Sequence, residues 1–538
     1  MKMKKNLTIG LGIILSTFFN IVLCSGAEAG LDDLKKTEVR ITVPNREDRI
    51  DPMIYGQMLE DCSDRVIYDG AVGSDGSIRP HVDAILKSLN MPIVRWPGGT
   101  FVLEYQWERG IGPKDQRPVV PVFHWGKAEN HQFGTDEFLA WCQRVGTVPY
   151  INFNANPHPD PKIGGSLEQA LNWIEYVNGP ISSPYGKKRA QNGHPEPYNV
   201  LFWAIGNEDW GHFGRGVQST PEQYADRFNR WAAAIREKYP QIQLLGVGNS
   251  CGWDEIVLDQ CGKSIDWITQ HYYVTSRVEN GRIASPESST FAPAKTEEHL
   301  KKIVPVVNKY NEKYQRQDRP IRIAVDEWNN RHLVQKEGKK KPVFTRHDPR
   351  RLLDIAVIAG TLNSFIRLTP VVGMGNYIFP VNGHGIVRTE GDHEVYPTVL
   401  YPLFQLYRQK MIGRRLDAEV LGPGVSASDL SLFIEGDCSE ISLKDRKLTY
   451  IDCAAALKEP DQMNIVLINR SAAKDGVVDL HLPKGFHPVK CHRIKGPEIS
   501  SFNTKENRPV QYTETILNPD TLSFRISPCE FLLIECAR

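Results

Sequence analysis

The sequence predicts a (β/α)8 barrel followed by a C-terminal all-β sandwich domain. Three observations support this prediction. Eight short apolar runs, typical of buried strands, alternate with helix-like stretches over about 330 residues, which is the count and order of such a barrel. No glycine-rich phosphate-binding loop follows the first run, which argues against an open doubly wound sheet. Beyond residue 404 the pattern changes to short alternating runs broken by Gly, Pro, Asn and Asp, as in a β-sandwich.

The barrel is predicted to span residues 49–404. Its eight expected strands are Ile54–Glu60, Pro92–Pro97, Val148–Asn154, Phe202–Glu208, Gln243–Asn249, Trp267–Tyr273, Ile321–Trp328 and Val371–Phe379. The helix-like stretches between them include Asp136–Arg144, Ser166–Val177, Pro221–Lys238 and Thr296–Lys313. Proline is favoured at the first turn of a helix, so Pro221 after Ser219 and Thr220 marks the start of one helix.

The sandwich is predicted to span residues 405–538, with residues 30–48 contributing a strand from before the barrel. That early segment contains the alternating run Glu38–Val43. The later runs expected to form strands are Ser431–Ile434, Lys447–Cys453, Asn464–Asn469, Gly476–Leu482, Thr521–Ile526 and Phe531–Glu535. Because no long low-complexity linker separates the two regions, we expect the domains to pack closely.

Residues 1–29 resemble a secretory signal peptide. A lysine-rich start precedes the mostly apolar stretch Leu7–Cys24, and Ala27–Ala29 supplies a small-x-small cleavage site. We therefore expect export to the periplasm or the medium. A lipoprotein anchor at Cys24 ranks second, because Leu23 is bulky for that signal. A retained anchor helix ranks third, since the stretch is short and interrupted by polar residues, and no later segment is long and apolar enough to span a bilayer.

Composition excludes several classes of function. The formal net charge of the 538 residues is +1, which gives no support to binding nucleic acid or an anionic surface.

Five of the ten cysteines cluster near the C-terminus, so the sequence leaves open whether a disulfide forms among them after export: Cys438, Cys453, Cys491, Cys529 and Cys536. No Cys-x-x-Cys or His-x-x-x-His spacing indicates a metal site.

Two predicted strands end in acidic residues. The segment Phe202–Gly211 reads FWAIGNEDWG and places Glu208 just past an apolar run, while Ile321–Trp328 reads IRIAVDEW and does the same for Glu327. In a barrel of this type the carboxyl ends of the strands carry the chemistry. Two glutamates so placed are the minimum apparatus for retaining glycoside hydrolysis. A single glutamate of this kind more often caps a strand or pairs with arginine, and the repeated context is what favours catalysis.

Several longer segments then show a resemblance to glycoside hydrolase family 51, whose best-known members are α-L-arabinofuranosidases. They occur in order from about residue 50 to about residue 330 and so cover most of the predicted barrel. The run NGHPEPYN that leads into FWAIGNE is the most specific of them. The matching segments are IYGQMLE, RWPGGTFVLEYQWERGIGP, WIEYVNGP, NGHPEPYNVLFWAIGNE, QHYY and VDEWN. The C-terminal third resembles the family only in its β-sandwich character.

The resemblance implies roles for both glutamates. Glu208 resembles the family's general acid/base and Glu327 its nucleophile. A retaining mechanism requires the first to be protonated and the second ionised, with carboxyl groups about 5–5.5 Å apart. Two carboxylates and water suffice for this reaction, so no cofactor is expected.

The resemblance also implies substrate-binding residues. Asn207 corresponds to the residue that holds the 2-hydroxyl of the sugar, and Glu60 to a ligand of sugar hydroxyls. His271 with Tyr272 or Tyr273 corresponds to the strand end that orients the nucleophile, and the choice of tyrosine is open. Separately, Trp328 is a candidate for stacking on a sugar face, although tryptophans at a barrel rim often serve only in packing.

The chain departs from the family pattern at two positions. Family members usually carry Asn after Pro-Gly-Gly, where this chain has Thr100. They also tend to carry Gln near the eighth strand, where residues 373–377 read GMGNY and Asn376 is the candidate replacement. Both positions bear on which sugar is bound and leave the reaction class unaffected.

The sequence therefore predicts an exported retaining glycosidase that releases α-L-arabinofuranosyl residues from plant polysaccharides or oligosaccharides. Two alternatives stay open: an endo-β-1,4-glucanase or xylosidase of the same family, and a carbohydrate-binding relative without turnover. The second would be expected to lack one glutamate, and both are present. The resemblance also implies a homo-oligomer, because family members often form one.

Overall fold

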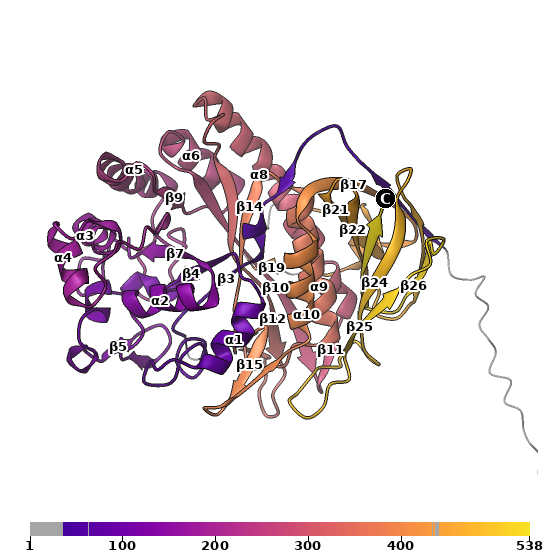
Figure 1. The fold of residues 1–538 in the computed structure, drawn as a ribbon, viewed down its shortest axis with the longest axis horizontal. Coiled ribbons are helices and arrows are strands. Elements are labelled where there is room, and N and C mark those ends of the chain that lie inside the picture. Colours follow the sequence, from indigo (N-terminus) through magenta and orange to yellow (C-terminus); the bar gives the residue numbers. More distant parts are fainter. Residues whose placement is uncertain (1–35, 63, 433, 436–440) are drawn as a thin grey trace, which may run out of the picture.

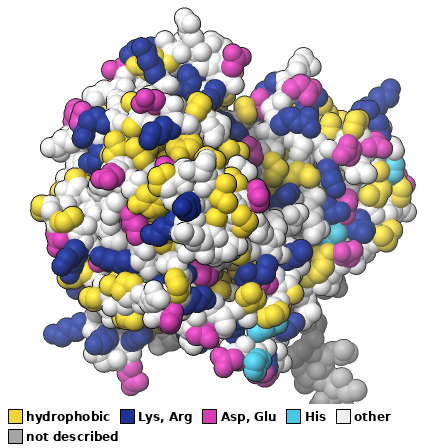
Figure 2. Space-filling view, turned by 60° about the vertical axis from the view of Figure 1, so that its left-hand side comes forward, with side chains coloured by type: hydrophobic (Ala, Val, Ile, Leu, Met, Phe, Trp, Pro, Cys, Tyr) yellow, Lys and Arg dark blue, Asp and Glu magenta, His cyan; other side chains and the backbone are white. Residues whose placement is uncertain are grey.

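The computed structural model describes residues 36–62, 64–432, 434–435 and 441–538 (Figure 1). The segment expected to be a signal peptide, residues 1–29 with Cys24, lies outside these ranges. Within them, no helix combines the length and apolar character needed to cross a membrane. On the face drawn in Figure 2, basic and acidic side chains are interspersed, as the near-zero net charge predicts.

The first unit is the predicted barrel of eight parallel strands, each paired with the next, and the last, β14, pairs with the first, β3. All eight expected strands are present. They are β3 (Gly56–Met58), β4 (Ile93–Trp96), β7 (Val148–Phe153), β8 (Phe202–Ile205), β9 (Gln243–Gly246), β10 (Trp267–Glu279), β12 (Arg322–Val334) and β14 (Val372–Tyr377). One buried side chain from each strand except β3 forms a common apolar cluster, made of Ile93, Tyr150, Ala204, Leu245, Trp267, Ala324 and Met374. Interior layers of this kind fill such barrels and make them solid.

Helices cover the outside of the barrel (Figure 1). They are α1 (Pro80–Ser88), α2 (Thr135–Val145), α3 (Leu167–Asn178), α4 (Pro184–Gln191), α5 (Pro221–Lys238), α6 (Cys251–Cys261), α7 (Pro286–Thr290), α8 (Pro293–Lys313), α9 (Leu352–Arg367) and α10 (Leu400–Lys410). The limits predicted for α5 are those observed. Thr220 caps its first turn by accepting from the backbone N–H of Gln223, and Pro221 occupies the first helical position.

Strands β10 and β12 are longer than the other barrel strands and stay paired beyond the barrel, as far as Val278 and Val334. Each folds back into a short antiparallel partner, β11 (Arg282–Ala284) for β10 and β13 (Val343–Thr345) for β12. A separate hairpin, β5 (Val120–Val122) with β6 (Lys127–Glu129), follows β4. The predicted sandwich strand at Ser431–Ile434 is wrong: β19 (Ile434–Glu435) pairs with β10 of the barrel sheet.

The second unit is a ten-stranded sheet with the order β25-β24-β27-β22-β21-β17-β1-β23-β26, in which β2 also pairs with β17. Strand β1 (Thr37–Thr42), from before the barrel, lies between β17 and β23. The other strands are β2 (Arg49–Ile50), β17 (Gly413–Leu421), β21 (Ile451–Glu459), β22 (Gln462–Asn469), β23 (Gly476–His481), β24 (His487–Lys495), β25 (Gln511–Ile516), β26 (Ser523–Ile526) and β27 (Phe531–Ala537). Four of them, β2, β17, β24 and β25, were not predicted. Strand β2 has only two residues, and the other three are rich in charged and polar residues.

Helix α9 lies between the barrel and this sheet and is buried along almost its whole length. Near its end, Asn363 and Arg367 both bond the carboxylate of Asp452 on β21. Helix α10 spans the predicted boundary between residues 404 and 405 and leads into the sheet.

The C-terminal disulfide that the sequence leaves open is not formed among the described cysteines of this domain. Cys453, Cys491, Cys529 and Cys536 are free, buried thiols, and Cys438 lies outside the described residues. Each of the four packs as a small apolar side chain, which is the usual state of a buried cysteine.

Candidate active site

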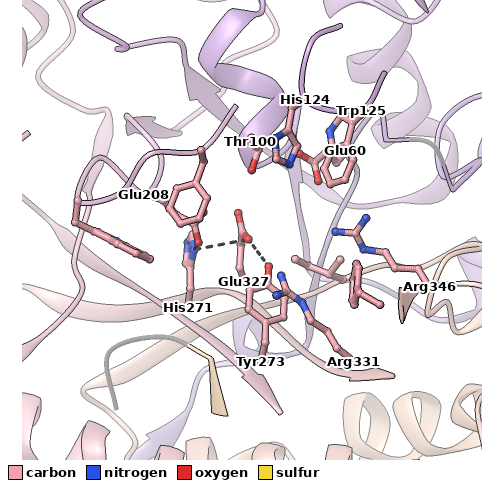
Figure 3. Close-up of a pocket in the computed structure, with 14 residues that line it drawn as sticks. Glu60, Thr100, His124, Trp125, Glu208, His271, Tyr273, Glu327, Arg331 and Arg346 are labelled. Atoms are coloured by element: carbon pink, nitrogen blue, oxygen red, sulfur yellow. Dashed lines mark hydrogen bonds and ion pairs between the residues drawn. The ribbon is translucent and has the colours of Figure 1, made fainter. Parts of the chain in front are cut away.

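A pocket of about 390 Å³ opens at the carboxyl ends of the barrel strands (Figure 3). Strand ends and the loops and hairpins that follow them supply its lining. The lining residues are Glu60, Thr100, His124, Trp125, Glu208, Trp210, Phe213, His271, Tyr273, Glu327, Arg331, Phe344, Arg346 and Ile378.

Glu208 and Glu327 enter the pocket from β8 and β12. The chain turns sharply after β8, with a positive φ of 95° at Gly206 and of 48° at Glu208 itself. A left-handed conformation is uncommon for a residue with a side chain, and such residues occur preferentially at functional sites. The turn is held by Asp209, which accepts from the backbone N–H of Asn207 at 3.0 Å and forms an ion pair with Arg227. Asp209 therefore points away from the pocket.

His271 lies between the two glutamates and binds both. Its Nδ1 is 2.7 Å from Oε1 of Glu208 and 3.6 Å from Oε2 of Glu327, and its Nε2 is 3.2 Å from Oδ1 of Asp326. Burial acts to lower the pKa of His271, but Glu327, Asp326 and Glu208 outweigh it and raise the pKa to about 10. His271 is thus an imidazolium at neutral pH. Asp326 supports the buried side of this imidazolium.

Glu327 is held in its ionised form. Burial alone would raise its pKa, but the charges of His271 and Arg95 and a hydrogen bond from the Tyr273 hydroxyl keep the pKa below its ordinary value. Arg95, only 1% exposed, places Nη1 2.7 Å from Oε1 of Glu327. Its other terminal nitrogen, Nη2, donates to Oδ1 of Asn207 at 2.7 Å. One buried guanidinium therefore orients the nucleophile candidate and its neighbour Asn207 together.

Glu60 lines the pocket just past the end of the first strand, β3. Its Oε1 accepts from the backbone N–H groups of Gly99 and Phe101 at 3.2 and 3.0 Å. Burial, followed by the charge of Glu327, raises the pKa of Glu60 to about 7. The adjoining glycines permit this close packing: a Cβ on Gly98 would lie 2.4 Å from Cγ of Glu60, and one on Gly99 would lie 2.3 Å from Oε1 of Glu327.

Most of the sequence-predicted site residues meet at this pocket. Glu60, Thr100, Glu208, His271, Tyr273 and Glu327 line it. Asn207 lies just beneath, 1% exposed, and its Nδ2 has no hydrogen-bond partner among the described residues. A buried amide nitrogen without a partner is costly, so this atom is placed to donate to a bound hydroxyl group.

Tyr272, Trp328 and Asn376, also predicted to bind substrate, lie elsewhere. Side chains alternate along a strand, so Tyr272 and Trp328 point to the outer face, away from their inward-facing neighbours. Tyr272 bonds His299 on α8, and Trp328 packs edge-on against Phe365 on α9. Asn376 donates across the sheet to the carbonyl of Gln57 at 2.9 Å. Of the two tyrosines left open by the sequence, Tyr273 reaches the pocket.

Several pocket residues were not predicted. Arg331 could have been found by counting in steps of two along β12 from Glu327, because alternate residues share a face. Arg95 lies near the end of β4, in the RWPGG segment, and the glycines of that segment indicated the end of a strand. His124, Trp125 and Arg346 lie in or beside hairpins, where no periodic signal indicates which side chain turns inward.

One cluster has a geometry that a metal ion could use. Glu208, His271 and Glu327 each offer one ligand atom, and these atoms lie within 4.8 Å of one another. The same atoms already form hydrogen bonds and ion pairs among themselves.

Known proteins resemble this chain along most of its length. Residues 85–291 match the α-L-arabinofuranosidase 1 domain model. The probable α-L-arabinofuranosidase C of Aspergillus fumigatus is 30% identical over 506 residues, covering 90% of this chain and 94% of that protein. The intracellular exo-α-L-arabinofuranosidase of Bacteroides ovatus is 24% identical, covering 95% of this chain and 97% of that protein.

A solved structure of an α-L-arabinofuranosidase has the same fold. The thermostable family-51 α-L-arabinofuranosidase of Thermotoga petrophila superimposes with a TM-score of 0.77 at 27% identity, covering 93% of this chain and 99% of that one. Barrel and sandwich are thus accounted for by one family along nearly the full length of the chain. The chain belongs to the α-L-arabinofuranosidases of glycoside hydrolase family 51.

Proposed function

We propose that this glycoside hydrolase releases terminal α-L-arabinofuranosyl residues with retention of configuration, by double displacement with Glu208 and Glu327. The observation that carries the proposal is the spacing of the two carboxylates. One oxygen of each lies within 4.8 Å of the other, bridged by the same imidazole nitrogen. Retaining enzymes keep the two carboxyl groups about 5–5.5 Å apart, whereas inverting enzymes leave about 6.5–9.5 Å for a water molecule.

In the first step Glu327 attacks the anomeric carbon, and the bond to the leaving oxygen breaks as Glu208 donates a proton to that oxygen. Glu208 carries this proton on Oε2, because its Oε1 accepts from Nδ1 of His271. In the second step Glu208 takes a proton from water, and the resulting hydroxide displaces Glu327 from the sugar. The ionised state of Glu327, favoured by His271, Arg95 and Tyr273, suits it to attack.

The remaining pocket residues are assigned to binding. Asn207 donates its unpartnered Nδ2 to the 2-hydroxyl of the furanose, an interaction that strengthens as charge develops in the transition state. Glu60 and Thr100 face hydroxyls at the far side of the ring. Tyr273 is a positioning residue for Glu327 through its hydroxyl.

The pocket suits the release of one terminal sugar. The β5–β6 hairpin, through His124 and Trp125, and the β12–β13 hairpin, through Arg331 and Phe344, form two of its walls. An endo-acting glucanase would need an open cleft to accommodate chain on both sides of the bond. We therefore propose that the substrates are arabinofuranosyl branches of plant polysaccharides and their oligosaccharides.

The experiment that tests this proposal is proton NMR during hydrolysis of 4-nitrophenyl α-L-arabinofuranoside. The α-anomer of arabinose should appear first and the β-anomer only as mutarotation proceeds. Initial formation of the β-anomer would exclude the double displacement. Hydrolysis of β-xylosides or β-1,4-glucans in preference to arabinofuranosides would favour the rival activities in this family.

We further propose that the chain is exported, with residues 1–29 removed. The basic start, apolar stretch and small-x-small site support this proposal. The relative from Bacteroides ovatus is named as intracellular, so relatives can differ in location. The test is the mass of the protein recovered from the native host: loss of the first 26–29 residues supports export, whereas an intact N-terminus in the cytoplasmic fraction contradicts it.

A further inference from the structure

Two guanidinium groups lie at the mouth of the pocket, both close to one aromatic ring. Arg331 comes from β12 and Arg346 follows β13, and their central carbons lie 5.3 and 5.0 Å from the centre of the Phe344 ring. Phe344 is 40% exposed, which places this group at the rim of the pocket. In Figure 3, Arg331 and Arg346 lie across Glu327 from Glu208.

Arg346 is fixed by packing yet retains unused donors. Its guanidinium lies 4.8 Å from the centre of the Trp125 ring, so it is held between Trp125 and Phe344. Among the described residues, the one acceptor that it bonds is Asp64, whose Oδ2 is 2.9 Å from Nη1. An arginine has five N–H donors, so most of the fork remains available to a ligand in the pocket.

Arg331 is positioned by a different contact. Its guanidinium lies 3.3 Å from the centre of the Tyr273 ring, and the hydroxyl of that ring donates to Glu327. Strand alternation places Arg331 on the same face as Glu327, four residues earlier on β12. The pocket therefore has a cationic side that begins beside the nucleophile and extends to the rim.

A neutral arabinofuranose carries no anionic group with which the two guanidinium groups could pair. An arginine fork matches the two oxygens of a carboxylate, and an exposed aromatic ring can stack on the face of a sugar. A sugar residue that carries a carboxylate, a uronic acid, combines both recognition elements. In an exo-acting pocket, the rim contacts the part of the substrate that stays behind after the terminal sugar is released.

We propose that the pocket mouth binds the carboxylate of a uronic acid residue in the leaving part of the substrate, through Arg346 and Arg331, with Phe344 against the sugar ring. The natural substrate class is then an acidic, uronate-containing glycan bearing arabinofuranosyl branches. This inference rests on the proposed function, because the terminal arabinofuranosyl group must occupy the inner pocket.

The test compares two oligosaccharides that differ only in one carboxyl group. In both, an α-L-arabinofuranosyl residue is linked to the same position of a hexose, which is galactose in one and galacturonic acid in the other. A charge-assisted bond at a partly exposed site predicts that the kcat/KM of the wild-type enzyme is about 10-fold higher for the acidic compound. This preference should fall as NaCl is raised, because salt screens the pair.

Variants identify the residues responsible. Arg346→Gln should bring the ratio of acidic to neutral kcat/KM close to 1, and Arg346→Lys should retain part of it. Arg331→Gln should also lower the ratio and gives an independent result if Arg346→Gln fails to fold. The matched control is Arg230→Gln, an exposed arginine on α5 that pairs only with Asp226 four residues earlier in the described structure, and it should leave the ratio unchanged.

The outcomes separate this inference from the proposed function. If the wild-type enzyme hydrolyses 4-nitrophenyl α-L-arabinofuranoside but shows a ratio near 1 that neither arginine variant alters, the uronate site is refuted and the arabinofuranosidase stands. If arginine variants lower both rates equally, Arg346 and Arg331 only neutralise neighbouring carboxylates, and the inference is likewise overturned. Absence of arabinofuranoside hydrolysis in the wild type would refute the proposed function itself.

Discussion

The backbone of Gly99 lies directly against the carboxylate of Glu327, and Gly99→Ala would test how closely the nucleophile must be held. A methyl group on this residue would place its carbon 2.3 Å from Oε1 of Glu327. Glu327 cannot rotate freely out of the way, because Oε1 is bonded to Arg95 at 2.7 Å and Oε2 accepts from Tyr273.

The magnitude follows from the size of this overlap. Nonbonded heavy atoms pack at about 3.5 Å, so either Glu327 or the Gly98–Gly99 turn must move by about 1 Å. A displacement of that size in a reacting group costs about 100-fold in rate, or about 2.7 kcal/mol in the activation barrier. We therefore expect kcat/KM to fall by about two orders of magnitude in a protein that still folds.

The assay is kcat/KM on 4-nitrophenyl α-L-arabinofuranoside, with the midpoint of thermal unfolding measured beside it. Gly252→Ala is the matched control: this glycine lies in the first turn of α6, and a methyl group there would approach only Oγ of Ser250, at 4.0 Å. The control should keep both activity and Tm. A folded Gly99→Ala protein with kcat/KM within about 3-fold of wild type would refute the argument that this contact positions Glu327.

Four further predictions concern residues of the pocket. Glu327→Ala should abolish turnover, and added azide should restore part of it and yield the glycosyl azide of inverted configuration; near-normal activity would remove Glu327 from the mechanism. Glu208→Ala should lose far less rate on nitrophenyl glycosides than on natural oligosaccharides, since a good leaving group scarcely needs protonation, and equal losses on both would argue against an acid role. Thr100→Asn should raise kcat/KM on arabinofuranosides about 2- to 13-fold relative to xylosides, because one hydrogen bond to a neutral hydroxyl contributes that factor. An unchanged ratio of the two kcat/KM values would place Thr100 out of contact with the sugar. Tyr273→Phe removes a hydrogen-bond donor to the ionised form of Glu327, which should raise the pKa of Glu327. The acid limb of the kcat/KM–pH profile should then move to higher pH. If the acid limb stays in place, it does not report the ionisation of Glu327.

The barrel was predictable because its signals are local. Each strand is an apolar run, and helix α5 carries its own start signal in Thr220 and Pro221. The sandwich was harder to predict. Strand β25 (Gln511–Ile516) is exposed at every position and lies at the edge of the sheet, so it carries no apolar alternation. Strand β19 (Ile434–Glu435) reads like a sandwich strand, and only its pairing with β10 assigns it to the barrel sheet.

Some residues of the site were likewise predictable from local sequence, and others were not. Glu208 and Glu327 were found because each directly follows a buried strand, and their pairing indicated the chemistry. Trp328, a candidate for stacking on sugar, points outward against Phe365, in the direction that simple alternation from Glu327 gives. The positions of Trp125 and Arg346 depend on how two hairpins fold over the pocket, and this is set by contacts between segments more than 200 residues apart in the chain.

Helix α9 has a consequence for how this enzyme can be divided. Because its side chains are covered by barrel strands on one side and by β21, β22 and β27 on the other, neither unit has a complete surface of its own. Cutting the chain after α10 would expose a wide apolar face and strip Arg367 of its Asp452 partner. The sandwich is thus no detachable accessory module, and exchanging it between enzymes would require transplanting α9 with it.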